Sequence, residues 1–135
     1  MSNNLEKMIA VKTLFKYVLT VFSFLWFISC QPQEGFIKKI NKTAIKTKVI
    51  GKDVQLIDVR TPQEYKNGFI DDAVNFNIND DTFIDQIDAL DKNEPVYLYC
   101  RMGGRSNRAA ELMKARGFKK IYDYSGGYDD WSMTE

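Results

Sequence analysis

The sequence contains no histidine, so a Cys–His pair is excluded from the possible catalytic arrangements. Cysteine is also scarce, because the 135 residues include only Cys30 and Cys100, and no cluster has the spacing of metal ligands. We therefore expect neither a metal site nor a cofactor. The formal net charge is +1 and no basic stripe stands out in the domain, so nucleic acid is not an expected partner.

The composition is that of one globular domain. Hydrophobic residues account for 44% of the chain, charged residues for 27% and aromatic residues for 13%, which is sufficient for a core. Segments typical of strands alternate with segments typical of helices, which predicts an α/β fold with a mainly parallel central sheet and helices on both faces. We expect strands over residues 36–40, 54–59, 73–78, 95–100 and 119–124. We expect helices over 43–49 and 62–65, after the caps Asn41 and Thr61, then from Asp80–Asp81 to about Leu90, over 106–116 before Gly117, and a short helix or turn over 128–131.

The chemistry is expected where the central strand ends at Cys100. The following loop contains two arginines and two glycines, and Ser106, a candidate N-cap, then opens a helical pattern. Such a strand–loop–helix segment directs backbone N–H groups and the positive end of a helix dipole at the centre of the loop, where they stabilise an anion. The same field stabilises a thiolate, so Cys100 is a candidate nucleophile. The candidate site consists of Cys100, Arg101, Met102, Gly103, Gly104, Arg105 and Ser106.

A cysteine at the end of a strand is also a common small buried residue. A purely structural turn, however, needs neither the two cations Arg101 and Arg105 nor so many exposed amides. The whole segment therefore favours a functional role for Cys100 over a structural one.

Several motifs stand in the order in which the rhodanese-like sulfurtransferases have them, and the segment after the central strand resembles the active-site loop of that family. The other matching pieces are LIDVR at 56–60, TPQEY at 61–65, residues 68–70 and 73–76, and Gly126–Gly127 with Trp131. The resemblance covers about residues 35–131 and implies a rhodanese-like fold. It also implies a Cys100 persulfide as covalent intermediate.

From this resemblance we expect a sulfurtransferase. It would take sulfur from a small anionic donor such as thiosulfate and pass it to cyanide or to a thiol acceptor, for which a thioredoxin-like protein is one candidate. Arg101 and Arg105 would hold the charge of the donor. Phe69 departs from the family pattern, which usually has histidine there, and Asp71–Asp72 stand where proline–glycine is usual. We expect these departures to affect packing or loop geometry more than the reaction.

Asp58 and Arg60, at the end of a buried strand, have two interpretations. The carboxylate can bond loop amides and pair with the arginine, or both residues can face a ligand at the carboxyl edge of the sheet. The resemblance favours the structural role for Asp58 and leaves the role of Arg60 open.

Three other functions compete with sulfur transfer. A non-catalytic docking module would not need Cys100 and both arginines. A redox role would need an external thiol, because the domain has no second cysteine that could resolve an oxidised Cys100. The active site of a cysteine–arginine phosphatase has a similar plan. Its loop, however, has five residues between the cysteine and the arginine, whereas four residues separate Cys100 from Arg105.

The N-terminus has the features of an export signal. Three lysines precede an uncharged, apolar run over residues 17–28, which ends at Ser29 and Cys30. Secretory signals have an apolar core of about 7–15 residues, whereas a spanning helix needs about 20. We therefore predict a signal sequence over 1–29, a linker over 30–35 and the rhodanese-like domain over 36–135.

The junction resembles a bacterial lipoprotein signal, although Phe27 stands where leucine is more usual. The resemblance implies that Cys30 is lipidated and tethers an exported domain to the membrane, on the periplasmic or cell-surface side of a bacterial envelope. One alternative is an uncleaved N-terminal helix. The other is a disulfide between Cys30 and Cys100, which we rank lower because it would consume the thiol that the anion-binding loop surrounds.

Overall fold

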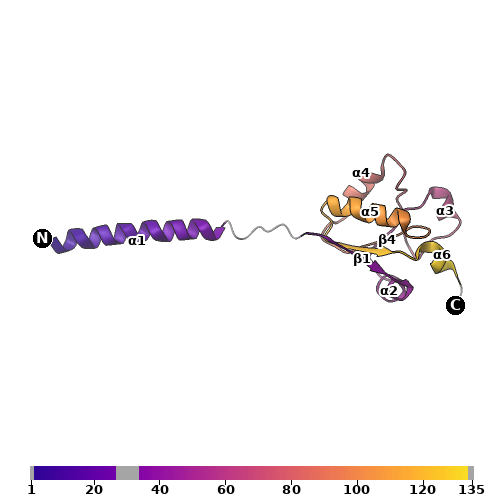
Figure 1. Cartoon of the computed structure of the whole chain (residues 1–135), viewed down its shortest axis with the longest axis horizontal. Helices are drawn as coiled ribbons and strands as arrows, with labels where there is room; N and C mark the ends of the chain where they lie inside the picture. Colours follow the sequence, from indigo (N-terminus) through magenta and orange to yellow (C-terminus); the bar gives the residue numbers. More distant parts are fainter. Residues whose placement is uncertain (1, 27–33, 134–135) are drawn as a thin grey trace. The chain divides into compact units, whose positions relative to one another are not determined.

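The structure is a computed structural model that describes residues 2–26 and 34–133. The chain divides into two units, residues 1–33 and 34–135 (Figure 1). The described part of the first unit is helix α1 (Ser2–Trp26). Among the described residues, no helix is both long and apolar enough to cross a membrane. Ser29 and Cys30 lie outside the described residues, so cleavage and lipidation there stay predictions.

The second unit is built on a five-stranded sheet with the order β1-β5-β4-β2-β3. The strands are β1 (Phe36–Ile40), β2 (Gln55–Asp58), β3 (Val74–Asn75), β4 (Val96–Tyr99) and β5 (Lys120–Tyr124), and every pair is parallel. Parallel neighbours require crossover connections, and helices supply them here. The predicted α/β fold with a parallel central sheet is confirmed.

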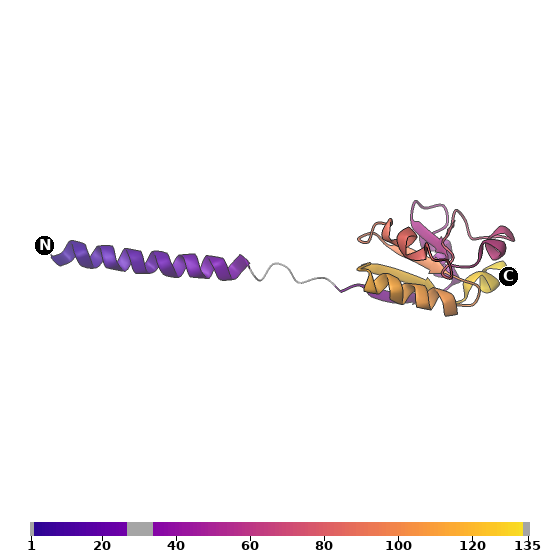
Figure 2. The same cartoon turned by 90° about the horizontal axis from the view of Figure 1, so that it is seen from above.

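Helices cover both faces of this sheet, as predicted. The helices are α2 (Lys42–Lys48), α3 (Pro62–Lys66), α4 (Phe83–Asp88), α5 (Gly104–Ala115) and α6 (Gly127–Ser132). In Figure 1, α4 and α5 lie above the sheet and α2 lies below it, and Figure 2 shows α5 running along the sheet.

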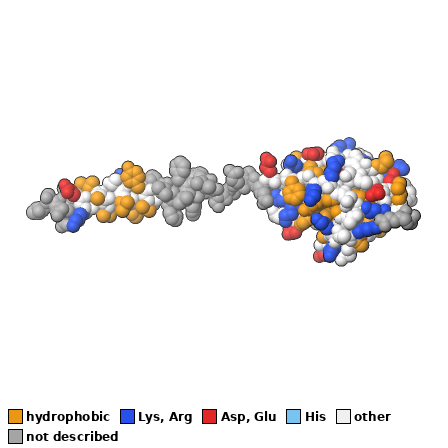
Figure 3. All heavy atoms as spheres, turned by 60° about the horizontal axis from the view of Figure 1, so that its bottom comes forward, with side chains coloured by type: hydrophobic (Ala, Val, Ile, Leu, Met, Phe, Trp, Pro, Cys, Tyr) orange, Lys and Arg blue, Asp and Glu red, His pale blue; other side chains and the backbone are white. Residues whose placement is uncertain are grey.

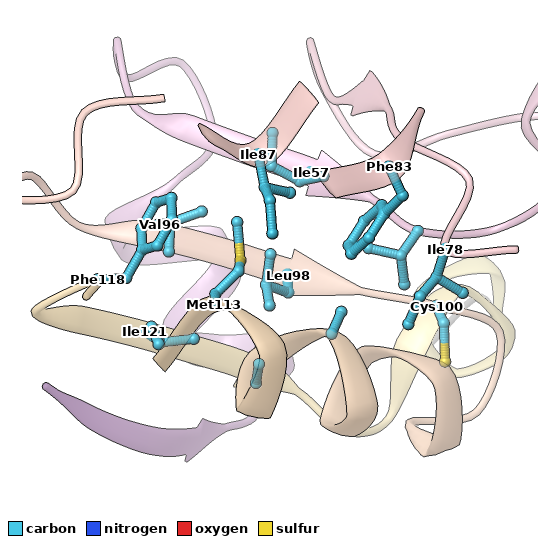
Figure 4. Packing of buried hydrophobic residues seen from close by; sticks show 13 residues of the cluster. Ile57, Ile78, Phe83, Ile87, Val96, Leu98, Cys100, Met113, Phe118 and Ile121 are labelled. Carbon is cyan, nitrogen blue, oxygen red and sulfur yellow. The ribbon is translucent and has the colours of Figure 1, made fainter. Parts of the chain in front are cut away.

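The alternation of side chains along β4 builds a core on each face. Val96 and Leu98 point toward α4 and α5, where they meet Phe83, Ile87 and Met113 (Figure 4). Tyr97 and Tyr99 point the other way and pack with Ile45 and Val49 of the α2 segment. All four residues of β4 are buried, because successive side chains of a strand alternate between two covered faces.

Local sequence signals explain the helix that begins at Pro62. The Thr61 hydroxyl accepts a hydrogen bond from the Glu64 N–H, and the Glu64 carboxylate accepts one from the Thr61 N–H. This reciprocal capping box satisfies two helix-terminal donors and confirms Thr61 as the cap. Asn41 likewise accepts from the Ala44 N–H at 3.0 Å and caps α2, as predicted.

Three predicted boundaries are wrong. Helix α5 begins at Gly104 rather than near Ser106, because Gly103 adopts a φ of +89° and serves as the N-cap. Helix α4 begins after Thr82, because Asp80 forms a turn with Thr82 instead of capping the helix, and it ends at Asp88. The third predicted strand shortens to Val74–Asn75, because a turn that starts at Asn77 follows it closely.

The β1–α2 edge of the sheet is basic. Residues 36–52 include six lysines and no acidic residue. Figure 3, in which the α2 side of Figure 1 comes forward, shows lysine and arginine side chains spread over the domain surface. Lys42 donates to the carbonyl oxygens of Asp130 and Met133 and thereby ties α2 to the end of the chain.

Candidate active site

Cys100 directly follows β4, the middle strand of the sheet, and its side chain turns toward the start of α5 (Figure 4). The residue is 2% exposed and its thiol is free. The Sγ atom accepts a hydrogen bond from the Gly103 N–H at 3.1 Å. Because an amide donor favours the anionic form of its acceptor, this contact stabilises a thiolate or a persulfide anion.

The left-handed conformation of Gly103 aims its N–H at the sulfur. At a φ of +89° any other residue is strained, and a Cβ atom here would lie 2.5 Å from the Ser125 carbonyl oxygen. The loop therefore requires glycine for two independent reasons. Gly103 is also the N-cap of α5, and the dipole of this helix adds positive potential at the loop.

The start of α6 holds the loop from the other side. The Tyr128 N–H donates to the Cys100 carbonyl at 2.8 Å, and the Asp129 N–H donates to the Arg101 carbonyl at 3.2 Å. Gly127 brings the two segments together, because a Cβ atom there would lie 2.6 Å from the Cys100 carbonyl oxygen. The Gly126–Gly127 motif thus allows the backbone at the start of α6 to lie close to the backbone of Cys100 and Arg101.

Arg105 lies beside the thiol but is already paired. Its two terminal nitrogens donate to the two carboxylate oxygens of Glu64, both at 2.7 Å. These bonds lower the pKa of Glu64 to about 2. The same bonds raise the pKa of Arg105, and the Cys100 side chain raises it further by a smaller amount. Arg105 can therefore reach an anion at Cys100 while Glu64 fixes its position.

Arg101 is on the outside of the loop. Its side chain is 60% exposed, and its Nε atom lies 3.0 Å from Oδ2 of Asp129. Met102 is exposed as well, at 70%, whereas Gly103 is buried. Gly104 has open space where a Cβ atom would be. The structure thus brings Arg105 and Gly103 to the sulfur and leaves Arg101 and Met102 on the rim.

Asp58 and Arg60 form a buried support below the site. Arg60 is 3% exposed and Asp58 0%, and the Arg60 Nε donates to both oxygens of Asp58 at 2.9 Å. Burial alone lowers the pKa of Arg60, but the hydrogen bond and charge of Asp58 outweigh it, so the net shift is upward. Arg60 also donates to the Gly68 carbonyl and stacks on Tyr128 at 4.0 Å. This buried and paired position favours the structural interpretation of Arg60 over a ligand-binding one.

Ser106 is not the N-cap that the sequence suggests. It lies in the first turn of α5, fully buried, and its hydroxyl lies 2.6 Å from Oδ1 of Asp123 and 3.2 Å from the Gly103 carbonyl oxygen. Gly103 takes the cap position because glycine permits the left-handed turn there. The Ser106 hydroxyl thus makes buried contacts instead of capping the helix, and its supporting role stays a prediction.

Phe69 and Asp71, at the two departures from the family pattern, make local packing and turn contacts. Phe69 is 45% exposed and stacks on Tyr65 with ring centroids 4.5 Å apart. Asp71 adopts a φ of +48°, and its carboxylate accepts a hydrogen bond from the Gly51 N–H at 2.8 Å. Asparagine and aspartate tolerate this left-handed region better than most residues, so the turn forms without proline–glycine.

Sequence reasoning missed three partners of the site: Glu64, Asp123 and Asp129. The Thr–x–x–Glu spacing marks Glu64 as a helix-capping residue, which is a local signal. No local signal connects Asp123 with Ser106 or Asp129 with Arg101, because each pair is joined only by the fold. In the described part of the chain, no group of three acidic, cysteine or histidine side chains could hold a metal ion.

The fold and the loop together define a class of proteins: α/β domains that hold a buried cysteine in an anion-stabilising loop after a central parallel strand. Within that class, this chain belongs to the rhodanese-like domain family, whose family model matches residues 41–134.

Similar proteins agree with this assignment. The thiosulfate sulfurtransferase GlpE of Shewanella oneidensis is 34% identical over 80 residues, which are 59% of this chain and 77% of that protein. YqhL of Bacillus subtilis is 36% identical over 80 residues, and the match spans 62% of its length. A rhodanese-like domain protein from Staphylococcus aureus has a solved structure with a TM-score of 0.63 and 32% identity, covering 70% of this chain and 91% of that one.

Proposed function

We propose that this protein is a sulfurtransferase that carries a sulfane sulfur as a persulfide on Cys100. The observation that carries the proposal is the environment of the Cys100 sulfur: a buried, free thiol at the end of the central strand that accepts a hydrogen bond from the Gly103 N–H. The family assignment and the sulfurtransferase names of relatives such as GlpE support it.

The first half of the reaction loads the enzyme. The Cys100 thiolate attacks the outer sulfur of an anionic donor such as thiosulfate. The sulfur–sulfur bond of the donor breaks, and its electron pair leaves with sulfite, so that Cys100 carries a persulfide. The Gly103 N–H donates to the Sγ atom of Cys100, and the α5 dipole adds positive potential that favours the negative charge of the persulfide.

The second half regenerates the thiolate. Cyanide or an acceptor thiolate attacks the terminal sulfur, and the electron pair of the broken bond returns to Cys100. Thiocyanate or an acceptor persulfide leaves. A thioredoxin-like protein is an acceptor of suitable chemistry, because it presents a reactive thiolate.

The arginines act on the donor in different ways. Arg105 is held at the sulfur by Glu64 and provides a fixed positive charge there. Arg101 is exposed and paired with Asp129, and such surface pairs contribute little free energy, so an incoming anion can replace the carboxylate. We expect Arg101 to attract the donor and Arg105 to stabilise the transferring sulfur.

We further propose that the domain is exported and tethered by a lipidated Cys30. The support is the basic start, the apolar run over 17–28 and the Ser29–Cys30 junction of the sequence. The tether would keep the domain on the periplasmic or cell-surface side of the envelope and limit its acceptors to thiols there.

Mass spectrometry tests the proposed chemistry. The purified full chain is incubated with thiosulfate, and the peptide that contains Cys100 is analysed without reduction. We expect an addition of one sulfur atom in the wild type and none in Cys100→Ser. An unmodified Cys100 peptide would favour the docking-module alternative, and a Cys100 sulfenic acid or mixed disulfide as the working state would favour the redox alternative.

The phosphatase alternative is tested in the same preparations. The four-residue spacing between Cys100 and Arg105 is one residue shorter than that of cysteine-dependent phosphatases, so fewer N–H groups surround a phosphoryl group. We expect negligible hydrolysis of aryl phosphates. Substantial hydrolysis that disappears in Cys100→Ser would overturn the assignment.

A further inference from the structure

Asp123 is a buried carboxyl group that the proposed reaction does not use. It lies in β5, opposite Leu98 of β4 in the sheet register, and its side chain has no exposed surface. The side chain lies against the first turn of α5, where Oδ1 is 2.6 Å from the Ser106 hydroxyl. A carboxyl group in such a place requires an explanation, because burying a charge without partners is costly.

The hydrogen bonds around the Ser106 hydroxyl indicate whether Asp123 is protonated or ionised. The Ser106 hydroxyl has one proton, yet two oxygens lie within reach of it, Oδ1 of Asp123 and the carbonyl oxygen of Gly103. If Asp123 were ionised, the hydroxyl would donate to the carboxylate and not to Gly103. If Asp123 is protonated, it donates to the Ser106 oxygen, and the Ser106 proton is free to bond the Gly103 carbonyl. The Gly103 carbonyl also accepts from the Asn107 N–H in either case, but only the protonated form lets both contacts of the Ser106 hydroxyl be hydrogen bonds at the same time.

The second oxygen of Asp123 supports the same conclusion. Among the described residues, Oδ2 has no hydrogen-bond partner. The Lys39 ammonium group lies 4.0 Å from Oδ2, on a side chain that is 62% exposed. Burial raises the pKa of Asp123, against smaller lowering effects of the Ser106 hydrogen bond and the Lys39 charge. A neutral acid tolerates a buried, unbonded oxygen far better than a carboxylate does.

This contact is directly connected to the reacting sulfur. The Gly103 carbonyl accepts from Ser106, and the Gly103 N–H, which belongs to the neighbouring peptide group on the other side of the Gly103 Cα, donates to Cys100 Sγ at 3.1 Å. The carbonyl also accepts from the Asn107 N–H as part of α5. Holding Gly103 by its carbonyl restricts the rotation that would turn its N–H away from the sulfur.

We propose that Asp123 is protonated at neutral pH and, through the Ser106 hydroxyl, fixes Gly103 so that its N–H points at the Cys100 sulfur. Asp123 and Ser106 are thus positioning residues, which act on the reaction only through Gly103. The inference rests on the proposed function for its consequence in sulfur transfer, but not for the state of the carboxyl group or of the thiol.

The test measures the carboxyl group and the thiol separately in the full-length protein. Infrared difference spectra between wild type and Asp123→Asn report a protonated carboxyl group. The rate at which iodoacetamide alkylates Cys100, followed on the Cys100 peptide across pH, reports how well the thiolate is stabilised. Neither measurement requires sulfur transfer, so failure of the persulfide experiment and failure of this inference are distinguishable.

Four variants separate the outcomes. Asp123→Asn keeps a donor toward Ser106, so we expect an unchanged pH midpoint of alkylation and nearly unchanged sulfur transfer. Ser106→Ala and Asp123→Val break the connection, and we expect a higher pH midpoint and a loss of sulfur transfer of about three- to tenfold, the range for one hydrogen bond. Thr47→Ala is the matched control, because it removes an exposed helix hydroxyl that also donates to a carbonyl, that of Thr43.

Two results would overturn the inference. One is the absence of a protonated-carboxyl band that Asp123→Asn removes. The other is a lower pH midpoint of alkylation in Asp123→Asn, because removing an ionised carboxylate would make the nearby thiolate easier to form. Both results come from Asp123→Asn, which keeps the shape of the side chain, so they stand even if Ser106→Ala or Asp123→Val folds poorly.

Discussion

Because Glu64 and Arg105 form an ion pair, we expect the stability of the folded domain to depend on pH. Both carboxylate oxygens of Glu64 accept from Arg105 at 2.7 Å, and the pKa of Glu64 falls from the ordinary 4.5 to about 2. A group whose pKa is lowered by folding stabilises the folded state above its unfolded pKa. This contribution is therefore complete above about pH 5, decreases as the pH falls toward the folded pKa of about 2, and is absent below it.

The size of the effect follows from the same shift. At about 1.4 kcal/mol for each pH unit, the full shift corresponds to about 3 kcal/mol. The Glu64 side chain is 29% exposed, so solvent screening reduces this value. We expect Glu64→Gln to lower the free energy of unfolding by about 1–2 kcal/mol at pH 7, or about 4–12 °C in Tm for a domain of this size.

Urea denaturation at several pH values tests this prediction. The difference in unfolding free energy between wild type and Glu64→Gln is expected to be full at pH 7, to shrink below about pH 5 and to be small near pH 2. Glu111→Gln is the matched control, because Glu111 is an exposed glutamate of α5. A difference that persists unchanged at low pH would mean that glutamine perturbs packing and that the ion pair is not the cause.

Four further predictions concern the loop, its support and the tether. Asp129→Asn should free Arg101 and lower the KM for thiosulfate about two- to fivefold with kcat unchanged, and a lower kcat instead would show that Asp129 acts on the chemistry. Gly103→Ala should destabilise the fold by about 2 kcal/mol or more and reduce sulfur transfer, because the left-handed φ and the Ser125 contact exclude a side chain; wild-type unfolding and activity would contradict this. Arg60→Met should lower the unfolding free energy by about 3–5 kcal/mol, because it leaves the buried Asp58 carboxylate unpaired, and near-normal stability in denaturation would refute a charged pair there. Cys30→Ser should release the protein from bacterial membranes or block its processing, whereas an unchanged membrane fraction and size would indicate an uncleaved helix.

Much of the fold is encoded locally. The apolar run at 96–99, between Pro95 and the loop after Cys100, predicts a buried strand, and the Thr61 and Asn41 caps predict where two helices begin. These signals work because backbone hydrogen bonds and side-chain alternation act over a few residues. The resemblance then places the nucleophile at Cys100, since the motif is contiguous in the chain.

The partners of the site residues are a product of tertiary structure. Arg105 and Glu64 are 41 positions apart, Arg101 and Asp129 are 28 apart, and Ser106 and Asp123 are 17 apart. These contacts exist because β4 lies between β5 and β2 in the sheet, an order that no local pattern of hydrophobicity encodes.

The sequence alone therefore identifies the thiol, the loop and the alternation of strands and helices, because each is a short-range property. The start of α5 at Gly104, the pairing of both arginines and the burial of Asp123 behind the loop depend on which strands are neighbours. Burial, charge pairing and hydrogen bonding act between surfaces that meet only after the sheet has formed. For that reason the tertiary structure, and not the motif, decides how the Cys100 sulfur is held.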